Sequence, residues 1–153
     1  MKVLIVEDDL LIGTYLQTLM AEFGHEVCAT ATSAGDAIRR AAASHPDVTL
    51  MDIRLSDGSS GIDAAREIHA RYRLRCIFLS GNPDEATRAA VAACEPIDFL
   101  AKPVMPSVLQ RALEKAENPE GVGNHQQRPS VTSIDLLANT RDLRLRPGGQ
   151  KVR

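Results

Sequence analysis

The sequence predicts an α/β protein in which five parallel strands form a sheet with helices on both faces. Short apolar runs alternate along the chain with segments whose apolar residues recur every three or four positions, the pattern of strands alternating with amphipathic helices. Connections are short, and parallel neighbours need right-handed helical crossovers. The run at residues 48–52 is apolar almost throughout, which favours a strand covered on both faces.

Each predicted strand is a short run bounded by polar or turn-forming residues. The predicted strands are residues 2–6, 26–30, 48–52, 76–80 and 97–101. The first stops at a group of acidic residues, and Pro46 marks the break before the third. The second is the weakest, and the fifth ends at Lys102 and Pro103.

The first two helices follow from apolar spacing and end signals. Residues 10–23 carry apolar side chains at helical spacing, and Gly24 supplies the stop. Ser33 and Asp36 resemble a capping box at the start of an Ala-rich second helix. We expect the small-residue face of that helix to pack inward.

The other three helices have similar signals. The apolar stripe of the third consists of Ile62, Ala65, Ile68 and Tyr72. For the fourth, which runs to about residue 93, we expect Asn82 as N-cap and Pro83 at the first helical position. Pro106 opens the fifth helix, whose leucines and alanines face inward.

The composition, 44% hydrophobic and 25% charged, is that of a soluble globular protein. No signal peptide opens the chain, and no apolar run reaches membrane-spanning length, so we expect a cytoplasmic protein. The cysteines form no CxxC pair and are expected as core residues in a reducing compartment: Cys28, Cys76 and Cys94. The histidines lack metal-ligand spacing and are expected at the surface or in loops: His25, His45, His69 and His125.

The end of the chain differs in charge and composition. Residues 118–153 hold six Lys/Arg against three Asp/Glu, a net charge of +3, whereas residues 1–117 carry -5. The segment begins with linker-like residues and has too few apolar residues for a core. We therefore expect one folded domain at residues 1–117 and a basic, mostly flexible extension at 118–153, too short for a DNA-binding domain.

Polar residues stand at the ends of four predicted strands. Glu7 and Asp8 follow the first strand and Asp52 ends the third. Ser80 ends the fourth, and Lys102 follows the fifth. The carboxyl ends of parallel strands meet at one edge of a sheet, so these side chains should share a crevice. Crowded carboxylates need a cation, and Mg²⁺ prefers carboxylate and phosphate oxygens.

Each of these residues alone has a simpler explanation. The acidic residues after the first strand could cap a helix, and Asp52 could belong to a turn. Ser80 alone suits a turn and Lys102 a surface loop. Only the combination indicates chemistry: if Asp52 attacks a phosphoryl group, Lys102 and the Ser80 hydroxyl could stabilise the transferred oxygens.

Four short segments together resemble the receiver domain of bacterial two-component response regulators, the CheY-like family. The segments are Val3-Leu4-Ile5-Val6-Glu7-Asp8, Leu50-Met51-Asp52, Leu79-Ser80-Gly81 and Phe99-Leu100-Ala101-Lys102-Pro103. The resemblance covers about residues 1–117. It implies a flavodoxin-like, doubly wound sheet with strand order 2-1-3-4-5.

The same resemblance implies a phosphoacceptor site. Asp52 would accept a phosphoryl group from a sensor histidine kinase or a phosphotransfer protein. Glu7, Asp8 and Asp52 would hold Mg²⁺ together with the backbone carbonyl of Arg54. The protein would then be no enzyme in the ordinary sense, because it would catalyse only its own phosphoryl transfer and dephosphorylation.

The resemblance also implies a switch that ends in protein contacts. Ser80 and Lys102 would bind the phosphoryl oxygens, and Phe99 would turn inward and reshape the surface for a downstream protein partner. Arg54 and Asn82 would flank the attacking water and tune the lifetime of the phosphoryl group. We expect a single-domain regulator without direct DNA binding, and a homodimer is compatible with this expectation.

Two other functions remain open at this point. An aspartate-nucleophile phosphatase of the haloacid dehalogenase type also uses a strand-end Asp with Mg²⁺ and a Lys, but it needs a second Asp where this chain has Arg54. A degenerate receiver that serves as a constitutive binding module would not be phosphorylated. The retained acidic residues, Ser80 and Lys102 argue against it.

Overall fold

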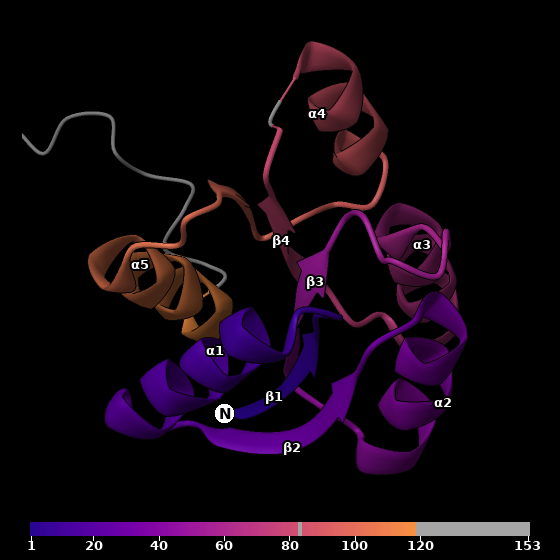
Figure 1. Ribbon diagram of the computed structural model, residues 1–153. Coiled ribbons are helices and arrows are strands. Elements are labelled where there is room, and N and C mark those ends of the chain that lie inside the picture. The colour runs from indigo at the N-terminus through magenta and orange to yellow at the C-terminus, as the bar shows by residue number, and fades with distance from the viewer. Residues whose placement is uncertain (83, 119–153) are drawn as a thin grey trace, which may run out of the picture. The chain divides into compact units, whose positions relative to one another are not determined.

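A computed structural model describes residues 1–82 and 84–118, which form a five-stranded parallel sheet with the order β2-β1-β3-β4-β5 (Figure 1). The strands are β1 (Lys2–Val6), β2 (Glu26–Ala31), β3 (Val48–Asp52), β4 (Cys76–Ser80) and β5 (Asp98–Ala101). The helices are α1 (Leu10–Glu22), α2 (Ala34–Ser44), α3 (Gly61–Tyr72), α4 (Glu85–Ala92) and α5 (Pro106–Glu117). The predicted fold class and strand order are confirmed. The predicted extension lies outside the described residues, apart from its first residue, Asn118.

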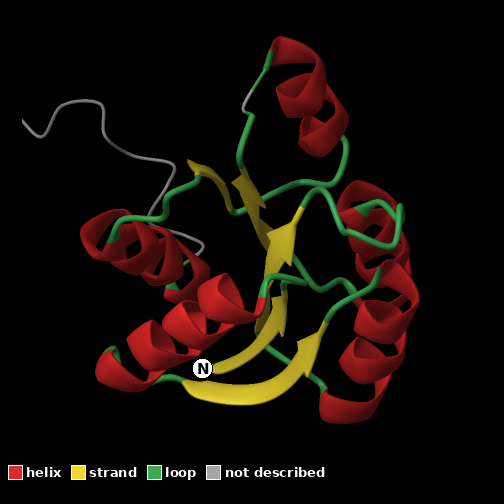
Figure 2. Ribbon diagram, viewed as in Figure 1, coloured by secondary structure: helices red, strands yellow, loops and turns green. Residues whose placement is uncertain are grey.

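Helices cover both faces of the sheet (Figure 2). Helices α1 and α5 pack on one face, over a core that includes Ile5, Leu50 and Leu79. Helices α2, α3 and α4 contribute to the core on the other face, which includes Met51 and Phe78. Strand β3 lies between β1 and β4 and is buried along its whole length, as the apolar run at residues 48–52 predicts. Within the described part of the chain, no helix is long and apolar enough to span a membrane.

Side chains at the helix starts account for two of the boundaries. The Asp9 carboxylate caps α1 by accepting two backbone N–H groups of its first turn. The Ser33 hydroxyl accepts the backbone N–H of Asp36 at the start of α2. The Asp36 carboxylate, however, binds Arg39 and Arg40 rather than completing a capping box.

The expected start of α4 is wrong. Asp84, not Asn82, is the N-cap: its carboxylate accepts the backbone N–H of Thr87 at 2.7 Å, and the helix begins at Glu85. The backbone N–H of Asn82 instead donates to the Ser80 hydroxyl at 3.2 Å, which holds Asn82 in the turn that follows β4. Pro83 lies outside the described residues.

Two aromatic side chains, those of His69 and Tyr72, differ from expectation. His69 lies within α3 with its side chain only 17% exposed, because it faces the segment after α4, where its Nε2 is 3.8 Å from Glu95. His25 lies in the loop between α1 and β2, as expected, with its side chain 10% exposed and 3.8 Å from Glu117 near the end of α5. Tyr72, expected in the apolar stripe, is 40% exposed at the last residue of α3.

Candidate functional site

The carboxyl edge of the sheet brings together a buried ion-pair network. The Lys102 ammonium lies 2.6 Å from one carboxylate oxygen of Glu7 and 2.6 Å from one of Asp52. The side chains of Glu7 and Asp52 are 1% and 9% exposed, and that of Lys102 is 16% exposed. Three strands, β1, β3 and β5, therefore deliver their terminal charges to one point, as the sequence predicts.

Asp8 completes an acidic cluster with these two carboxylates. One oxygen each of Glu7, Asp8 and Asp52 lies within 4.8 Å of the others. Three carboxylates outnumber the single Lys102 ammonium, so the cluster retains negative charge. Carboxylate oxygens so placed are the donors that a hard divalent cation prefers, and the arrangement fits such an ion.

The environment of Glu7 and Lys102 shifts their pKa values in defined directions. Burial raises the pKa of Glu7, and the Asp52 carboxylate adds to the rise, although the hydrogen bond and charge of Lys102 oppose it. Burial by itself lowers the pKa of Lys102, but its hydrogen bonds to Asp52 and Glu7 outweigh that effect, so the pKa is raised. Lys102 therefore stays charged and is fixed against the carboxylates.

The loop between β3 and α3 braces the acidic cluster through backbone groups. The second carboxylate oxygen of Asp52 accepts the backbone N–H of Arg54 at 3.1 Å. Asp8 accepts the backbone N–H of Ser56 at 3.2 Å. Backbone N–H groups of the loop therefore hold the carboxylates of Asp52, at the end of β3, and Asp8, just after β1.

Gly61 allows this loop to close, and the sequence reasoning did not identify its role. A Cβ on Gly61 would lie 1.8 Å from the backbone carbonyl oxygen of Asp52, closer than any real contact. The Gly61 backbone N–H donates to the carbonyl of Ile53 at 3.0 Å. The signal available in the sequence was a glycine directly before the apolar stripe that begins at Ile62, since glycine allows a close approach of the backbone to another segment.

A hollow of about 360 Å³ opens beside Asp52. It is lined by Asp52, Ile53, Arg54, Ser80, Gly81, Asn82 and Lys102. Ser80 is 5% exposed, so its hydroxyl is held at the wall of the hollow rather than free in solvent. The structure thus brings Ser80, Arg54 and Asn82 to the same hollow as the acidic cluster.

Phe99, the predicted switch residue, is not among the residues that line this hollow. It lies on β5 beside Phe78 of β4 and is half-buried against the core. The Arg88 guanidinium of α4 lies 4.7 Å from the centroid of its ring. The sequence reasoning missed Arg88, because nothing in the spacing of residues indicates this contact.

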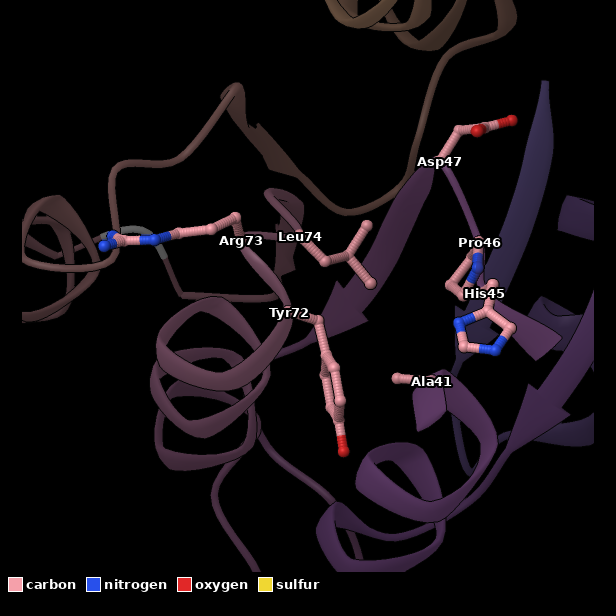
Figure 3. A pocket seen from close by; sticks show the side chains of 7 residues that line it. All are labelled: Ala41, His45, Pro46, Asp47, Tyr72, Arg73 and Leu74. Carbon is pink, nitrogen blue, oxygen red and sulfur yellow. The ribbon is translucent and has the colours of Figure 1, made fainter. Parts of the chain in front are cut away.

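A second hollow, of about 260 Å³, lies at the opposite end of β3. Its lining residues are Ala41, His45, Pro46, Asp47, Tyr72, Arg73 and Leu74. Figure 3 shows the rings of Tyr72 and His45 on two sides of the hollow, whereas the charged ends of Arg73 and Asp47 point away from it. It contains none of the predicted site residues.

Comparison with known proteins identifies a family match. The response regulator receiver domain matches residues 3–114. The chain is 32% identical over 116 residues to the phyllosphere-induced regulator PhyR of Methylorubrum extorquens, covering 75% of this chain and 43% of that protein. It is 30% identical to the chemotaxis protein CheY of Thermotoga maritima, covering 74% of this chain and 95% of that protein.

Solved structures agree with these matches. The receiver domain of PhyR from Erythrobacter litoralis superposes with a TM-score of 0.68 at 33% identity, covering 76% of this chain and 88% of that one. PhyR from Brucella abortus superposes with a TM-score of 0.66 at 30% identity, covering 75% of this chain and 46% of that one. The chain spans less than half the length of the first curated relatives it matches, at 43% and 46%.

Proposed function

Because the chain belongs to the response regulator receiver family, the CheY-like domains of two-component signalling, we propose that Asp52 is its phosphoacceptor. The phosphoryl donor is a sensor histidine kinase or a phosphotransfer protein, and the signal passes to a downstream protein partner. One observation carries the proposal: the buried Asp52 carboxylate stands at the open edge of the sheet, paired with Lys102 and beside a hollow.

The reaction is a transfer between two nucleophiles. A carboxylate oxygen of Asp52 attacks the phosphorus of a phosphohistidine, a P–O bond forms, the P–N bond breaks, and the imidazole leaves with its electron pair and takes a proton from solvent. The product is an acyl phosphate on Asp52. The Lys102 ammonium is 2.6 Å from Asp52 and lines the same hollow as Ser80, which supports a role for both groups in binding the transferred oxygens.

Glu7, Asp8 and Asp52 would hold Mg²⁺, with the backbone carbonyl of Arg54 as a further ligand. When bound, the ion would neutralise charge on the phosphoryl oxygens. Glu7 and Asp52 form ion pairs with Lys102, so the ammonium and Mg²⁺ would compete for the same carboxylates.

The chain is a phosphoacceptor rather than an enzyme with a separate substrate. Hydrolysis of the acyl phosphate returns Asp52 to its starting state, and water must reach it through the hollow lined by Arg54 and Asn82. These two side chains therefore tune the lifetime of the signal. Ser80 and Phe99 carry the switch, and free thiols at all three cysteines fit a reducing cytoplasm.

The two alternatives make different predictions. A phosphatase of the haloacid dehalogenase type would need an acid at the position of Arg54, and the family match favours the receiver. A degenerate receiver would keep the fold but fail to accept phosphate. The ordered network of Glu7, Asp52 and Lys102 supports a functional acceptor.

The test is the intact mass of the protein after incubation with acetyl phosphate and Mg²⁺. We expect the wild type to gain the mass of one phosphoryl group and Asp52→Asn to gain none. Asp57→Asn is the matched control, because Asp57 lies in the same loop but binds Ser59. A wild type that gains no mass would support the degenerate receiver, and an Asp52→Asn variant that gains mass would contradict Asp52 as acceptor.

We also propose that residues 1–117 are sufficient for this reaction. The family match ends at residue 114, inside the predicted boundary. A chain truncated after residue 117 should have the melting temperature and phosphorylation rate of the full chain. Unfolding or loss of phosphorylation would show that part of the extension belongs to the domain.

A further inference from the structure

Helix α4 is held to the rest of the domain by few side chains. Val91 is its one fully buried residue, whereas α1, α3 and α5 each bury at least three. Figure 1 shows α4 beyond the end of β4. A short helix with one buried anchor depends strongly on any further contact with the sheet.

Arg88 supplies such a contact. It precedes Val91 by three residues, so both side chains lie on the same face of α4. Its guanidinium carbon is 4.7 Å from the centroid of the Phe99 ring, within the range of a cation–π interaction. Phe99 packs against the core cluster that contains Val91. Arg88 and Val91 therefore attach α4 to the sheet at neighbouring points.

We propose that Arg88 is a positioning residue that holds the Phe99 ring in its half-buried position and so limits how readily the switch responds to phosphorylation. This inference rests on the proposed function, in which Phe99 turns inward after Asp52 is phosphorylated. Since the contact joins the half-buried ring to the exposed side chain of Arg88, an inward turn would carry the ring away from the guanidinium. The contact therefore favours the half-buried position of Phe99 over the inward position.

The size of the effect follows from two-state arithmetic. A cation–π contact near the surface corresponds to roughly a two- to fivefold change in an equilibrium constant. For a ligand that needs the inward position, the apparent affinity is the intrinsic affinity multiplied by the fraction of molecules in which Phe99 already points inward. Removal of the contact should therefore strengthen the apparent binding of a phosphoryl mimic by about the same factor.

The experiment is a titration of the full chain with beryllofluoride, a phosphoryl mimic, in the presence of Mg²⁺. The readout is the ¹⁹F spectrum of protein labelled with fluorophenylalanine. The chain has three phenylalanines, and the Phe99 signal is the one missing from the spectrum of Phe99→Leu. We expect Arg88→Met to lower the midpoint about two- to fivefold, and Arg88→Lys to lie closer to the wild type because it keeps the cation.

The matched control is Arg111→Met, which removes the same charge from an exposed position on α5. Its midpoint should equal that of the wild type. If Arg88→Met leaves the midpoint unchanged while the wild type binds the mimic, this inference is wrong and the proposed function stands. A wild type that does not bind the mimic contradicts the proposed function itself.

A double-mutant cycle tests the contact without any ligand. Arg88 takes part in further interactions, so the single substitution alone does not isolate its effect on Phe99. The unfolding equilibria of Arg88→Met, Phe99→Leu and the double variant should show a coupling of about two- to fivefold. Additive effects of the two substitutions would overturn the proposal.

Discussion

Strand β3 has a hollow at each end, and the two differ in how their charged groups are arranged. At the carboxyl end, Lys102 binds Glu7 and Asp52 beside a hollow of about 360 Å³. At the amino end, the charged ends of Arg73 and Asp47 point away from a hollow of about 260 Å³ (Figure 3). The hollows are similar in size, but charges converge on one and diverge from the other.

Strand direction explains this difference. The carboxyl ends of parallel strands deliver residues from β1, β3, β4 and β5 to one edge, where the loops open a crevice. At the amino end, the chain arrives from the ends of helices. His45 and Arg73 have positive φ values, 46° and 57°, because they are the C-caps of α2 and α3. Concavity alone therefore does not identify the site.

Gly61→Ala should have the largest effect, because it affects the backbone at the carboxyl end. The added Cβ would meet the Asp52 carbonyl oxygen, so either the loop or the end of β3 must move. We expect urea unfolding to show a loss of about 3 kcal/mol or more. In Gly13→Ala the Cβ lies 3.9 Å from Glu7, and this helical control should gain about 0.5–1 kcal/mol. Equal stability of the two variants would contradict the close approach.

Lys102→Ala should have the next largest effect. It leaves the buried carboxylates of Glu7 and Asp52 without their cation, at a cost of about 3 kcal/mol in the absence of Mg²⁺. Mg²⁺ should raise the melting temperature of this variant more than that of the wild type, since the ammonium no longer competes for the oxygens. Lys115→Ala, which removes an exposed pair with Asp98, should cost at most about 1 kcal/mol.

In Lys102→Ala, phosphorylation of Asp52 should also no longer turn the Phe99 ring inward, so the ¹⁹F signal of Phe99 should not change. A variant that is destabilised but insensitive to Mg²⁺ would show that the carboxylates do not bind the ion.

The rate at which the Cys76 thiol is alkylated, followed against pH, measures how well the amino end of the sheet excludes solvent. Burial raises the pKa of its thiol to about 12. The thiolate is the reactive form, so at about pH 9 iodoacetamide should alkylate the half-buried Cys28 well before Cys76. The difference should persist until the pH approaches 12 and should disappear in urea. Equal rates in the native protein would show that this end of the sheet is open.

Tyr72→Ala should have the smallest effect. The side chain is 40% exposed and lines the hollow at the amino end. We expect a stability change of at most about 1 kcal/mol and an unchanged rate of phosphorylation by acetyl phosphate. A large loss of that rate would show that the two ends of β3 are coupled and that the contrast between them is incomplete.

The features predicted from sequence are those that depend on strand periodicity and strand ends. Buried β3 and the convergence of Glu7, Asp52 and Lys102 follow from the parallel arrangement, which places strand ends at one edge. Both were available from residue order alone.

The features that sequence reasoning missed depend on contacts across the fold. Asn82 and Asp84 are both good N-caps, and the structure identifies Asp84 because its carboxylate accepts the backbone N–H of Thr87, whereas Asn82 lies in the turn after Ser80. The contact between Arg88 and Phe99 depends on how α4 sits on the sheet. The close approach of Gly61 to Asp52 depends on the path of a loop.

The identity of the phosphorylated residue is the central claim, and reductive trapping tests it most directly. Borohydride converts an aspartyl phosphate to homoserine, so peptide mass mapping after treatment with acetyl phosphate and Mg²⁺ locates the modified carboxyl. We expect homoserine at position 52 and none at Asp8 or Asp57, and we expect Glu7 not to be reduced to 2-amino-5-hydroxyvalerate, the product that a glutamyl phosphate would give. A reduced residue at any of those three positions, with Asp52 unchanged, would contradict the account.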